Sequence, residues 1–323
     1  MPIISHSHRL SSFLNSFLAQ DKLRTVFSLL LMVLVFLYPG ENYFQTIFVP
    51  REMSLIPPLS LPNMRPYPLH DGTPAPSVTA YSVFVQDVNS GTVIYAKNPN
   101  AELMPASTTK IMTAIIALET FPDLEQNVVI ADAENAIGKE MKLQKNEKIS
   151  IKNLLYGLLI ESGNDAAFAL ASNHPEGYAG FVKAMNEKAA TLGLTGTIYR
   201  NPSGVEQVGH ITTARDLAVL ARYAVKIPTI SEIMQIKEVT VSDVSGVIRH
   251  RLFSTNELLG ALEGVKGLKT GWTENAGECL VTYVDRGGNP IVIVILKSED
   301  RFGETESLIN WVYNHHTWTV PSI

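Results

Sequence analysis

The sequence contains a single cysteine, Cys279, among its 323 residues. One cysteine excludes an internal disulfide and any cysteine-based zinc cluster. We therefore do not expect this chain to carry out redox chemistry. No run of Lys and Arg exceeds two residues, and 26 basic against 31 acidic residues give a formal net charge of −5. The charge pattern therefore lacks the basic footprint of a nucleic-acid-binding protein, and we expect no nucleic-acid partner.

The histidines show no spacing typical of metal ligands, because the closest ones, His6 with His8 and His315 with His316, lie at the two ends of the chain. We therefore expect neither a metal nor another cofactor. With 46% apolar and 18% charged residues, the composition is that of a globular protein. The length suffices for one large domain or two small ones.

The one long hydrophobic run lies near the N-terminus, where Lys22 and Arg24 precede the 13 nearly apolar residues Val26–Tyr38. This length suits a signal peptide better than a spanning helix, which needs about 20 residues. However, no small-x-small cleavage site follows, and aromatic and apolar residues extend the run to Val49. We expect a cytoplasmic tail (1–24) and an uncleaved membrane anchor (25–49), with a cleaved signal peptide or a buried core helix as alternatives.

Both membrane interpretations place the rest of the chain outside the cytoplasm, in the periplasm or on the cell-wall side, because the positive flank stays inside. Eight of the 18 prolines fall between Pro50 and Pro76. Proline at this density favours extended polyproline II over helix or sheet. Residues 50–77 are thus predicted to form a semi-rigid linker in front of a catalytic domain spanning 78–316.

The domain is predicted to begin with a hairpin, whose strands Val78–Gln86 and Thr92–Lys97 flank a turn at Asn89-Ser90-Gly91. A helix over 107–119 comes next. Four further helical patterns, two more strands and a last helix follow: Ile151–Ile160, Asp165–Ser172, Gly180–Leu192, Thr213–Val225, Glu278–Asp285, Pro290–Lys297 and Glu304–His315. This order predicts an α/β (α+β) fold in which an antiparallel sheet built from both ends of the domain is flanked by helices, with an inserted helical subdomain over about 122–230.

The first candidate catalytic motif is Ser107-Thr108-Thr109-Lys110, which is the only Ser-x-x-Lys in the chain. On a helix, residues three apart share one face, so the Lys110 amine can serve as a base for the Ser107 hydroxyl. Pro105-Ala106 places Ser107 in the first turn, where free backbone N–H groups favour a developing negative charge. Taken alone, the motif favours the simpler interpretation of a capping serine and a solvated lysine.

Two further motifs follow. Ser162-Gly163-Asn164 lies between two predicted helices, where a turn can direct both polar side chains into a cleft, although Ser254-Thr255-Asn256 has the same pattern and helix junctions often carry such residues as caps. Lys269-Thr270-Gly271 lies just before the strand that starts near Glu278, or in a strand leading to it. Its glycine permits close approach of a ligand to the backbone and its lysine suits a carboxylate, while an exposed turn lysine is the simpler interpretation.

The three motifs occur in a fixed order, with separations of 55 and 107 residues, and this combination is the signature of penicillin-binding proteins and class A β-lactamases. Over about Val78 to His315 the sequence resembles the D-alanyl-D-alanine carboxypeptidases, the low-molecular-mass penicillin-binding proteins of peptidase family S11. The resemblance extends to the segments around and between the motifs: 105–114, 162–167, Met185-Asn186, Leu192-Gly193, Asn201-Pro202-Ser203-Gly204, 213–217, 267–273 and Ala276-Gly277. Members of this family often carry a C-terminal β-rich domain with an amphipathic anchor. We expect the N-terminal segment to anchor this chain instead.

The resemblance implies a serine-type hydrolase that removes the terminal D-Ala from peptidoglycan stem peptides ending in D-Ala-D-Ala, with β-lactam antibiotics as covalent inhibitors. Ser107 would be the nucleophile and Lys110 its base. Ser162 would pass a proton to the leaving amine, and Asn164 would orient Lys110 or the substrate amide.

By the same resemblance, Lys269 and Thr270 would hold the terminal carboxylate, with help from Thr273. The backbone N–H groups of Ser107 and Trp272, the residue after Gly271, would form the oxyanion hole. Arg301 resembles an arginine at the entrance of the family's last helix, with an exposed structural ion pair as the alternative.

Three other functions remain as alternatives. A class A β-lactamase shares the first and third motifs, but the second is Ser-Asp-Asn in that family, and residue 163 is Gly here. A D,D-endopeptidase uses the same nucleophile and cannot be separated by sequence. A non-catalytic cell-wall-binding module is disfavoured because every expected catalytic side chain is present. A shared fold does not by itself decide between these functions.

Overall fold

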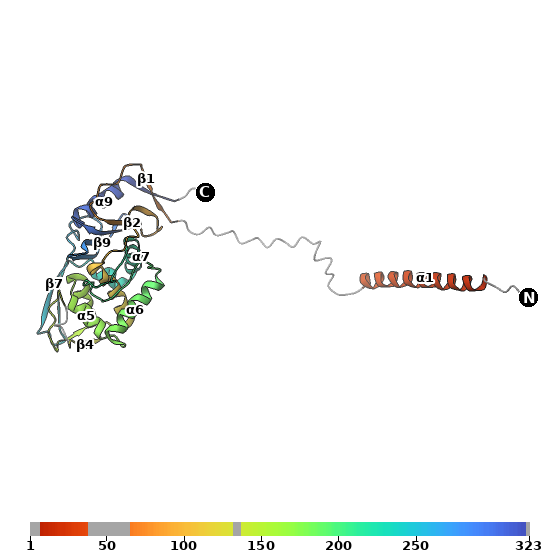
Figure 1. The fold of residues 1–323 in the computed structure, drawn as a ribbon, viewed down its shortest axis with the longest axis horizontal. Helices are drawn as coiled ribbons and strands as arrows, with labels where there is room; N and C mark the ends of the chain where they lie inside the picture. Colours follow the sequence, from red (N-terminus) through yellow and green to blue (C-terminus); the bar gives the residue numbers. More distant parts are fainter. Residues whose placement is uncertain (1–6, 38–64, 132–136, 321–323) are drawn as a thin grey trace, which may run out of the picture. The chain divides into compact units, whose positions relative to one another are not determined.

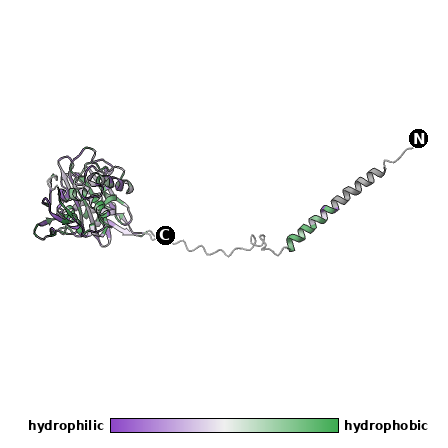
Figure 2. Cartoon of the chain, turned by 90° about the horizontal axis from the view of Figure 1, so that it is seen from below, coloured by the Kyte–Doolittle hydropathy of each residue, from purple (hydrophilic) through white to green (hydrophobic). Residues whose placement is uncertain are grey.

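The computed structural model describes residues 7–37, 65–131 and 137–320. The chain divides into two compact units, Met1–Asn63 and Met64–Ile323. The first contains α1 (Ser7–Leu37), whose residues from 22 onward are exposed and largely apolar (Figure 2). Among the described helices, none combines the length and apolar character that a membrane crossing requires. The predicted anchor extends from α1 into residues outside the described part of the chain.

The second unit is built on a five-stranded antiparallel sheet with the order β3-β2-β10-β9-β8 (Figure 1). Its strands come from both ends of the unit: β2 (Ser82–Asp87), β3 (Val93–Lys97), β8 (Val265–Thr273), β9 (Gly277–Arg286) and β10 (Asn289–Ser298). The predicted fold class is therefore confirmed. Strand β8 has a sheet neighbour on one side only, and its other edge is an edge of the sheet.

Helices cover both faces of this sheet. Alternate residues of a strand point to opposite faces, so apolar residues at successive positions need a covering helix on each face. On β10, Ile291, Ile293 and Ile295 belong to an apolar cluster with residues of α9 (Arg301–His315). The intervening Val292 and Val294 belong to a second cluster with α3 (Lys110–Thr120) and α7 (Ala214–Ala224). Apolar side chains on both faces make β10 a central, buried strand.

The predicted helical insertion is present (Figure 1), and its larger helices contact α3. Its elements are β4 (Asn127–Val129), β5 (Lys148–Ser150), α4 (Ile151–Tyr156), η3 (Gly157–Glu161), α5 (Asn164–Ser172), α6 (Gly177–Thr191) and α8 (Pro228–Ile233). Two small antiparallel pairs were not predicted, β4 with β5 and β6 (Glu238–Ser242) with β7 (Arg249–Phe253). Both pairs are short and lie away from the main sheet.

The two ends of the second unit meet in a further pair of strands. Strand β1 (Tyr67–His70) pairs antiparallel with β11 (His316–Thr319). The predicted domain starts at residue 78, whereas the compact unit already includes β1. Prolines 66 and 68 fit this position because β1 pairs on one side only, so a missing N–H is tolerated.

Candidate active site

Ser107 lies in a short 3₁₀ turn, η1 (Ala106–Thr109), directly before α3. The turn begins with Ala106 at φ +47°, a left-handed conformation that is uncommon for a residue with a side chain. Strand β8 passes close to this turn, and a Cβ added to Gly271 would lie 3.0 Å from the Ser107 backbone nitrogen. Glycine at position 271 therefore lets the edge of the sheet approach the backbone of Ser107.

The side chain of Lys110 is completely buried and makes three polar contacts. Its Nζ lies 2.9 Å from Ser107 Oγ, 2.6 Å from Asn164 Oδ1 and 2.8 Å from the Ser203 carbonyl oxygen. The amide and carbonyl oxygens can only accept hydrogen bonds. When the amine is neutral, its two hydrogens go to these two oxygens, and its lone pair faces the Ser107 hydroxyl.

The surroundings of Lys110 favour this neutral form. Burial and the nearby charges of Lys269 and Lys139 lower the pKa of Lys110 well below its usual value, against a smaller opposing effect of Asp165. A lysine becomes a general base when desolvation and like charges remove its proton. The geometry and the pKa thus agree that Lys110 can take a proton from Ser107.

Ser162 and Asn164 lie where a π-helical turn, η3, passes into α5. Ser162 ends η3 with a left-handed backbone, φ +66°, and it is buried. The following Gly163 has no room for a side chain, since a Cβ there would lie 2.7 Å from Asp165 Oδ1. This tight turn directs both polar side chains into the cavity that contains Ser107.

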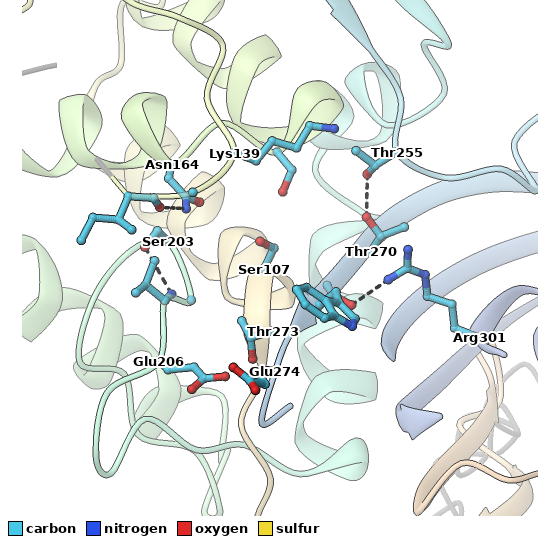
Figure 3. A pocket seen from close by; sticks show the side chains of 17 residues that line it. Ser107, Lys139, Asn164, Ser203, Glu206, Thr255, Thr270, Thr273, Glu274 and Arg301 are labelled. Atoms are coloured by element: carbon cyan, nitrogen blue, oxygen red, sulfur yellow. Dashed lines mark hydrogen bonds between the residues drawn. The ribbon is translucent and has the colours of Figure 1, made fainter. Parts of the chain in front are cut away.

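Lys269 and Thr270 are neighbours on β8. Thr270 lies on the opposite side of Ser107 from Asn164 (Figure 3). Burial, together with the charges of Lys139 and Arg301, lowers the pKa of Lys269 to about 7. The Thr270 hydroxyl lies 2.6 Å from that of Thr255. Arg301 points into the same cavity and donates a hydrogen bond to the Gly271 carbonyl oxygen at 2.9 Å.

These residues surround one cavity of about 750 Å³. Of the residues predicted from sequence, Ser107, Ser162, Asn164, Thr270, Gly271, Trp272 and Thr273 line it. Lys110 and Lys269 are buried behind this lining. Trp272 is 63% exposed, so its indole forms part of the open rim. The three motifs therefore meet around a single cleft.

Sequence reasoning missed several residues of the lining. Lys139, Ser203, Gly204, Glu206, Thr255 and Glu274 also border the cavity, as does Arg301, which the resemblance to family S11 had already raised (Figure 3). Two signals were in the sequence, since Ser203-Gly204 belongs to a segment that resembles the S11 family and Thr255 is in the repeated Ser-x-Asn pattern. Lys139 and the two glutamates carried no signal, because they read as ordinary surface charges.

The described residues contain no group of three or more His, Cys, Asp or Glu side chains arranged to hold a metal ion. The cleft offers a serine hydroxyl, with two buried lysines behind its lining, as its reactive groups. A serine hydroxyl that faces a neutral amine, next to a backbone N–H at the start of a helix, defines an acyl-transferring serine enzyme with a lysine base.

The chain belongs to peptidase family S11. Residues 70–300 match the model of this family, which is described as D-alanyl-D-alanine carboxypeptidase. The chain is 30% identical over 245 residues to the D-alanyl-D-alanine carboxypeptidase DacF of Bacillus subtilis, covering 73% of this chain and 63% of DacF. It is 31% identical over 255 residues to the D-alanyl-D-alanine endopeptidase of Escherichia coli, covering 76% of this chain and 81% of that protein.

Solved structures agree with this family assignment. The DD-transpeptidase of Streptomyces K15 superposes with a TM-score of 0.71 at 30% identity, covering 75% of this chain and all of that chain. A D-alanyl-D-alanine carboxypeptidase from Mycobacterium tuberculosis also gives a TM-score of 0.71 at 30% identity, covering 79% and 99% of the two chains. The similarity thus includes both the sheet and the helical insertion.

Proposed function

We propose that this protein is a serine-type D-Ala-D-Ala carboxypeptidase that removes the terminal D-Ala from peptidoglycan stem peptides. One observation carries the proposal: the buried, low-pKa amine of Lys110 lies 2.9 Å from Ser107 Oγ, with its two hydrogens engaged elsewhere. Family membership supplies the substrate class. β-Lactams would acylate the same serine.

In the first step, Ser107 Oγ attacks the carbonyl carbon of the penultimate D-Ala, and its proton passes to Lys110 Nζ. The backbone N–H groups of Ser107 and Trp272 would stabilise the oxyanion, a device that contributes several kcal/mol per donor. When the C–N bond breaks, the leaving amine of D-Ala receives a proton, relayed by Ser162. Water then attacks the acyl-enzyme with Lys110 as base and restores the Ser107 hydroxyl.

Substrate orientation follows from the charges at the β8 side of the cleft. The terminal carboxylate would lie against Lys269 and Thr270, with Thr255 and Arg301 nearby. Asn164 holds Lys110 in place through its side-chain oxygen. Because Lys269 and Thr270 would bind the terminal carboxylate close to Ser107, the cleft would select substrates that end one residue after the scissile bond.

The direct experiment compares the full-length wild type with Ser107→Ala. The variant should lose both D-Ala release from diacetyl-Lys-D-Ala-D-Ala and covalent labelling by fluorescent penicillin, while keeping its circular dichroism spectrum. D-Ala release by a folded Ser107→Ala protein would refute the assignment. Rapid turnover of penicillin, in place of a long-lived acyl complex, would support the β-lactamase alternative.

A D,D-endopeptidase is the second candidate, because relatives with that name match as well as the carboxypeptidases do. The same catalytic residues would cut a cross-link between two stem peptides. Analysis of muropeptide products distinguishes the two activities. Release of free D-Ala from monomeric muropeptides indicates a carboxypeptidase, and conversion of dimers to monomers indicates an endopeptidase.

We also propose that the enzyme acts on the outer side of the cytoplasmic membrane and is tethered there by the segment 25–49. Two facts support this tether: the basic residues Lys22 and Arg24 precede the apolar run, and peptidoglycan lies outside the cytoplasm. Membrane fractionation with alkaline carbonate extraction tests the tether. Full-length protein should stay with the membrane, whereas Leu30→Arg with Leu34→Arg should release it.

A further inference from the structure

A strap formed by residues 137–147 borders the catalytic cleft on the side of the helical insertion. Its Ile137, Gly138 and Lys139 line the cavity. The Lys139 ammonium lies 3.2 Å from Glu161 Oε1, and its charge contributes to lowering the pKa of both Lys110 and Lys269. The position of the strap therefore sets where the Lys139 ammonium stands at the cleft, which Figure 3 shows to be the side of Thr255.

On one side, α5 holds the strap. The Asn164 backbone N–H donates to the Lys139 carbonyl oxygen at 2.6 Å. The Asp165 carboxylate accepts from the backbone N–H groups of Met141 and Leu143, both at 3.0 Å. These contacts tie the strap to the helix that starts at the second motif.

On the other side, His250 of β7 holds the strap through both ring nitrogens. Nδ1 lies 2.9 Å from the Met141 carbonyl oxygen, and Nε2 lies 2.6 Å from Glu147 Oε1. The other carboxylate oxygen of Glu147 accepts from the Gln144 N–H at 2.8 Å. The side chains of His250 and Glu147 are 3% and 0% exposed, so water does not replace either contact.

The protonation state of His250 follows from its two partners and the charge of Glu147. A carbonyl oxygen and a carboxylate both accept hydrogen bonds, so both ring nitrogens must carry a proton while Glu147 is ionised. A neutral imidazole has one proton and would leave one of the two acceptors without a donor inside the protein. Such a buried, unpaired acceptor costs about 1–3 kcal/mol.

We propose that protonated His250, paired with Glu147, is a positioning residue that locks the strap and so keeps Lys139 at the mouth of the catalytic cleft. This inference rests on the proposed carboxypeptidase function. Lys139 would attract the terminal carboxylate of the substrate, so that loss of the lock raises KM more than it lowers kcat. Loss of the His250 proton at alkaline pH would release the strap in the same way.

The charges around His250 favour the protonated ring. Burial lowers the pKa of His250, but the hydrogen bond and charge of Glu147, with smaller contributions from Met141 and Asp165, raise it on balance. Other charged groups border the neighbouring cavity: Glu140 and Lys142 from the strap, Glu161 from η3, and Arg249 and Arg251 from β7 itself. Of these, Glu161 is paired with Lys139 and Arg251 with Glu238.

The experiment first measures the ring protonation directly, by ¹⁵N NMR of histidine-labelled full-length protein across pH 6–10. Both ring nitrogens of His250 should report imidazolium at pH 7. Steady-state kinetics with diacetyl-Lys-D-Ala-D-Ala are then compared over the same range. A neutral His250 ring at pH 7 in an active wild-type enzyme would overturn the proposal.

Glu147→Gln is the informative variant. The glutamine amide can donate to the bare Nε2 of a neutral His250, while its oxygen still accepts from Gln144, so the strap stays locked without a charge. The ratio of the KM of the variant to that of the wild type should therefore fall as the pH rises past the pKa of His250. A ratio independent of pH would contradict a lock that depends on the His250 proton.

His250→Phe removes the lock and should raise KM by about fivefold, the scale of one charge at a solvated surface, with a smaller change in kcat. Lys139→Gln should have the same effect, and the double variant should be no worse than either single one. If the two substitutions raised KM by the product of their separate factors in the double variant, His250 would not act through Lys139. If His250→Phe does not fold, Glu147→Gln and Lys139→Gln still decide the question.

A matched control is the exposed pair of His315 and Asp71, with 3.0 Å between Nδ1 and Oδ2. His315→Phe should leave the pH profile unchanged. A wild-type enzyme that releases no D-Ala would count against the proposed function alone, because the NMR titration tests the state of His250 independently.

Discussion

Asn164→Asp tests the lysine-base mechanism most sharply, because it changes one atom type and adds a charge next to Lys110. The retained oxygen, Oδ1, lies 2.6 Å from Lys110 Nζ in the wild type, and in the variant it becomes part of a carboxylate. A carboxylate at this position favours the ammonium form of Lys110. The base would then hold its proton at neutral pH and could not activate Ser107.

The size of the effect follows from the distance. At an effective dielectric constant of about 20, opposite charges 2.6 Å apart attract each other by about 6 kcal/mol, and desolvation of the new carboxylate offsets part of this. If about half remains, the pKa of Lys110 rises by about 2 units, at 1.36 kcal/mol per unit. The neutral fraction of Lys110, and with it the acylation rate at pH 7, should fall by up to about 100-fold.

Stopped-flow acylation by a fluorescent penicillin, measured from pH 6 to 10, provides the assay. Because Lys110 must lose its proton to act as base, the rise of the rate with pH should move to higher pH in Asn164→Asp, with partial recovery at the alkaline end of the range. Asn173→Asp, at the other end of α5, adds the same charge away from the cleft and serves as control. A uniform loss at every pH would refute the assigned role of Lys110.

Three further predictions concern other parts of the structure. Gly204→Ala places a Cβ 1.8 Å from the Ala106 carbonyl oxygen at a backbone φ of +86°, so the Ser107 peptide must shift and the penicillin acylation rate should fall at least about 100-fold. Because the pKa of Lys269 is about 7, KM for diacetyl-Lys-D-Ala-D-Ala should rise from pH 7 to 9, whereas a C-terminally amidated peptide, which lacks the carboxylate, should show no such rise. Glu304→Ala leaves the donors of Ala80 and Ser298 unpaired in the core and should lower the free energy of unfolding by about 2–4 kcal/mol in urea titrations, with unchanged penicillin labelling.

The elements that sequence predicted are those determined by local patterns. The turn at Asn89-Ser90-Gly91 and the double glycine after Arg286 do join antiparallel strands. Ser107 and Lys110 face each other because a spacing of three residues places them on one side of a helical turn. The meeting of the three motifs followed from the resemblance to family S11.

The elements that sequence missed are those determined by distant contacts. Strand β8, which the sequence offered only as one of two placements for the third motif, carries Gly267, Gly271 and a buried lysine in place of an alternating apolar pattern, because its side chains and its edge serve the cleft. The strap is held by backbone groups and by residues from α5 and β7, which no local periodicity connects. Lys139 reads as a surface lysine until the fold places it beside Ser107.

The unpaired side of β8 has a consequence for which molecules can occupy the cleft. A stem peptide lying there would become a temporary sixth strand, recognised through its main chain, and main-chain recognition is indifferent to the identity of side chains. The cleft would then distinguish between peptides at their carboxyl terminus, where a free carboxylate must reach the buried ammonium group of Lys269. Such a cleft would tolerate variation in the body of the peptide and reject an extra residue at its carboxyl terminus.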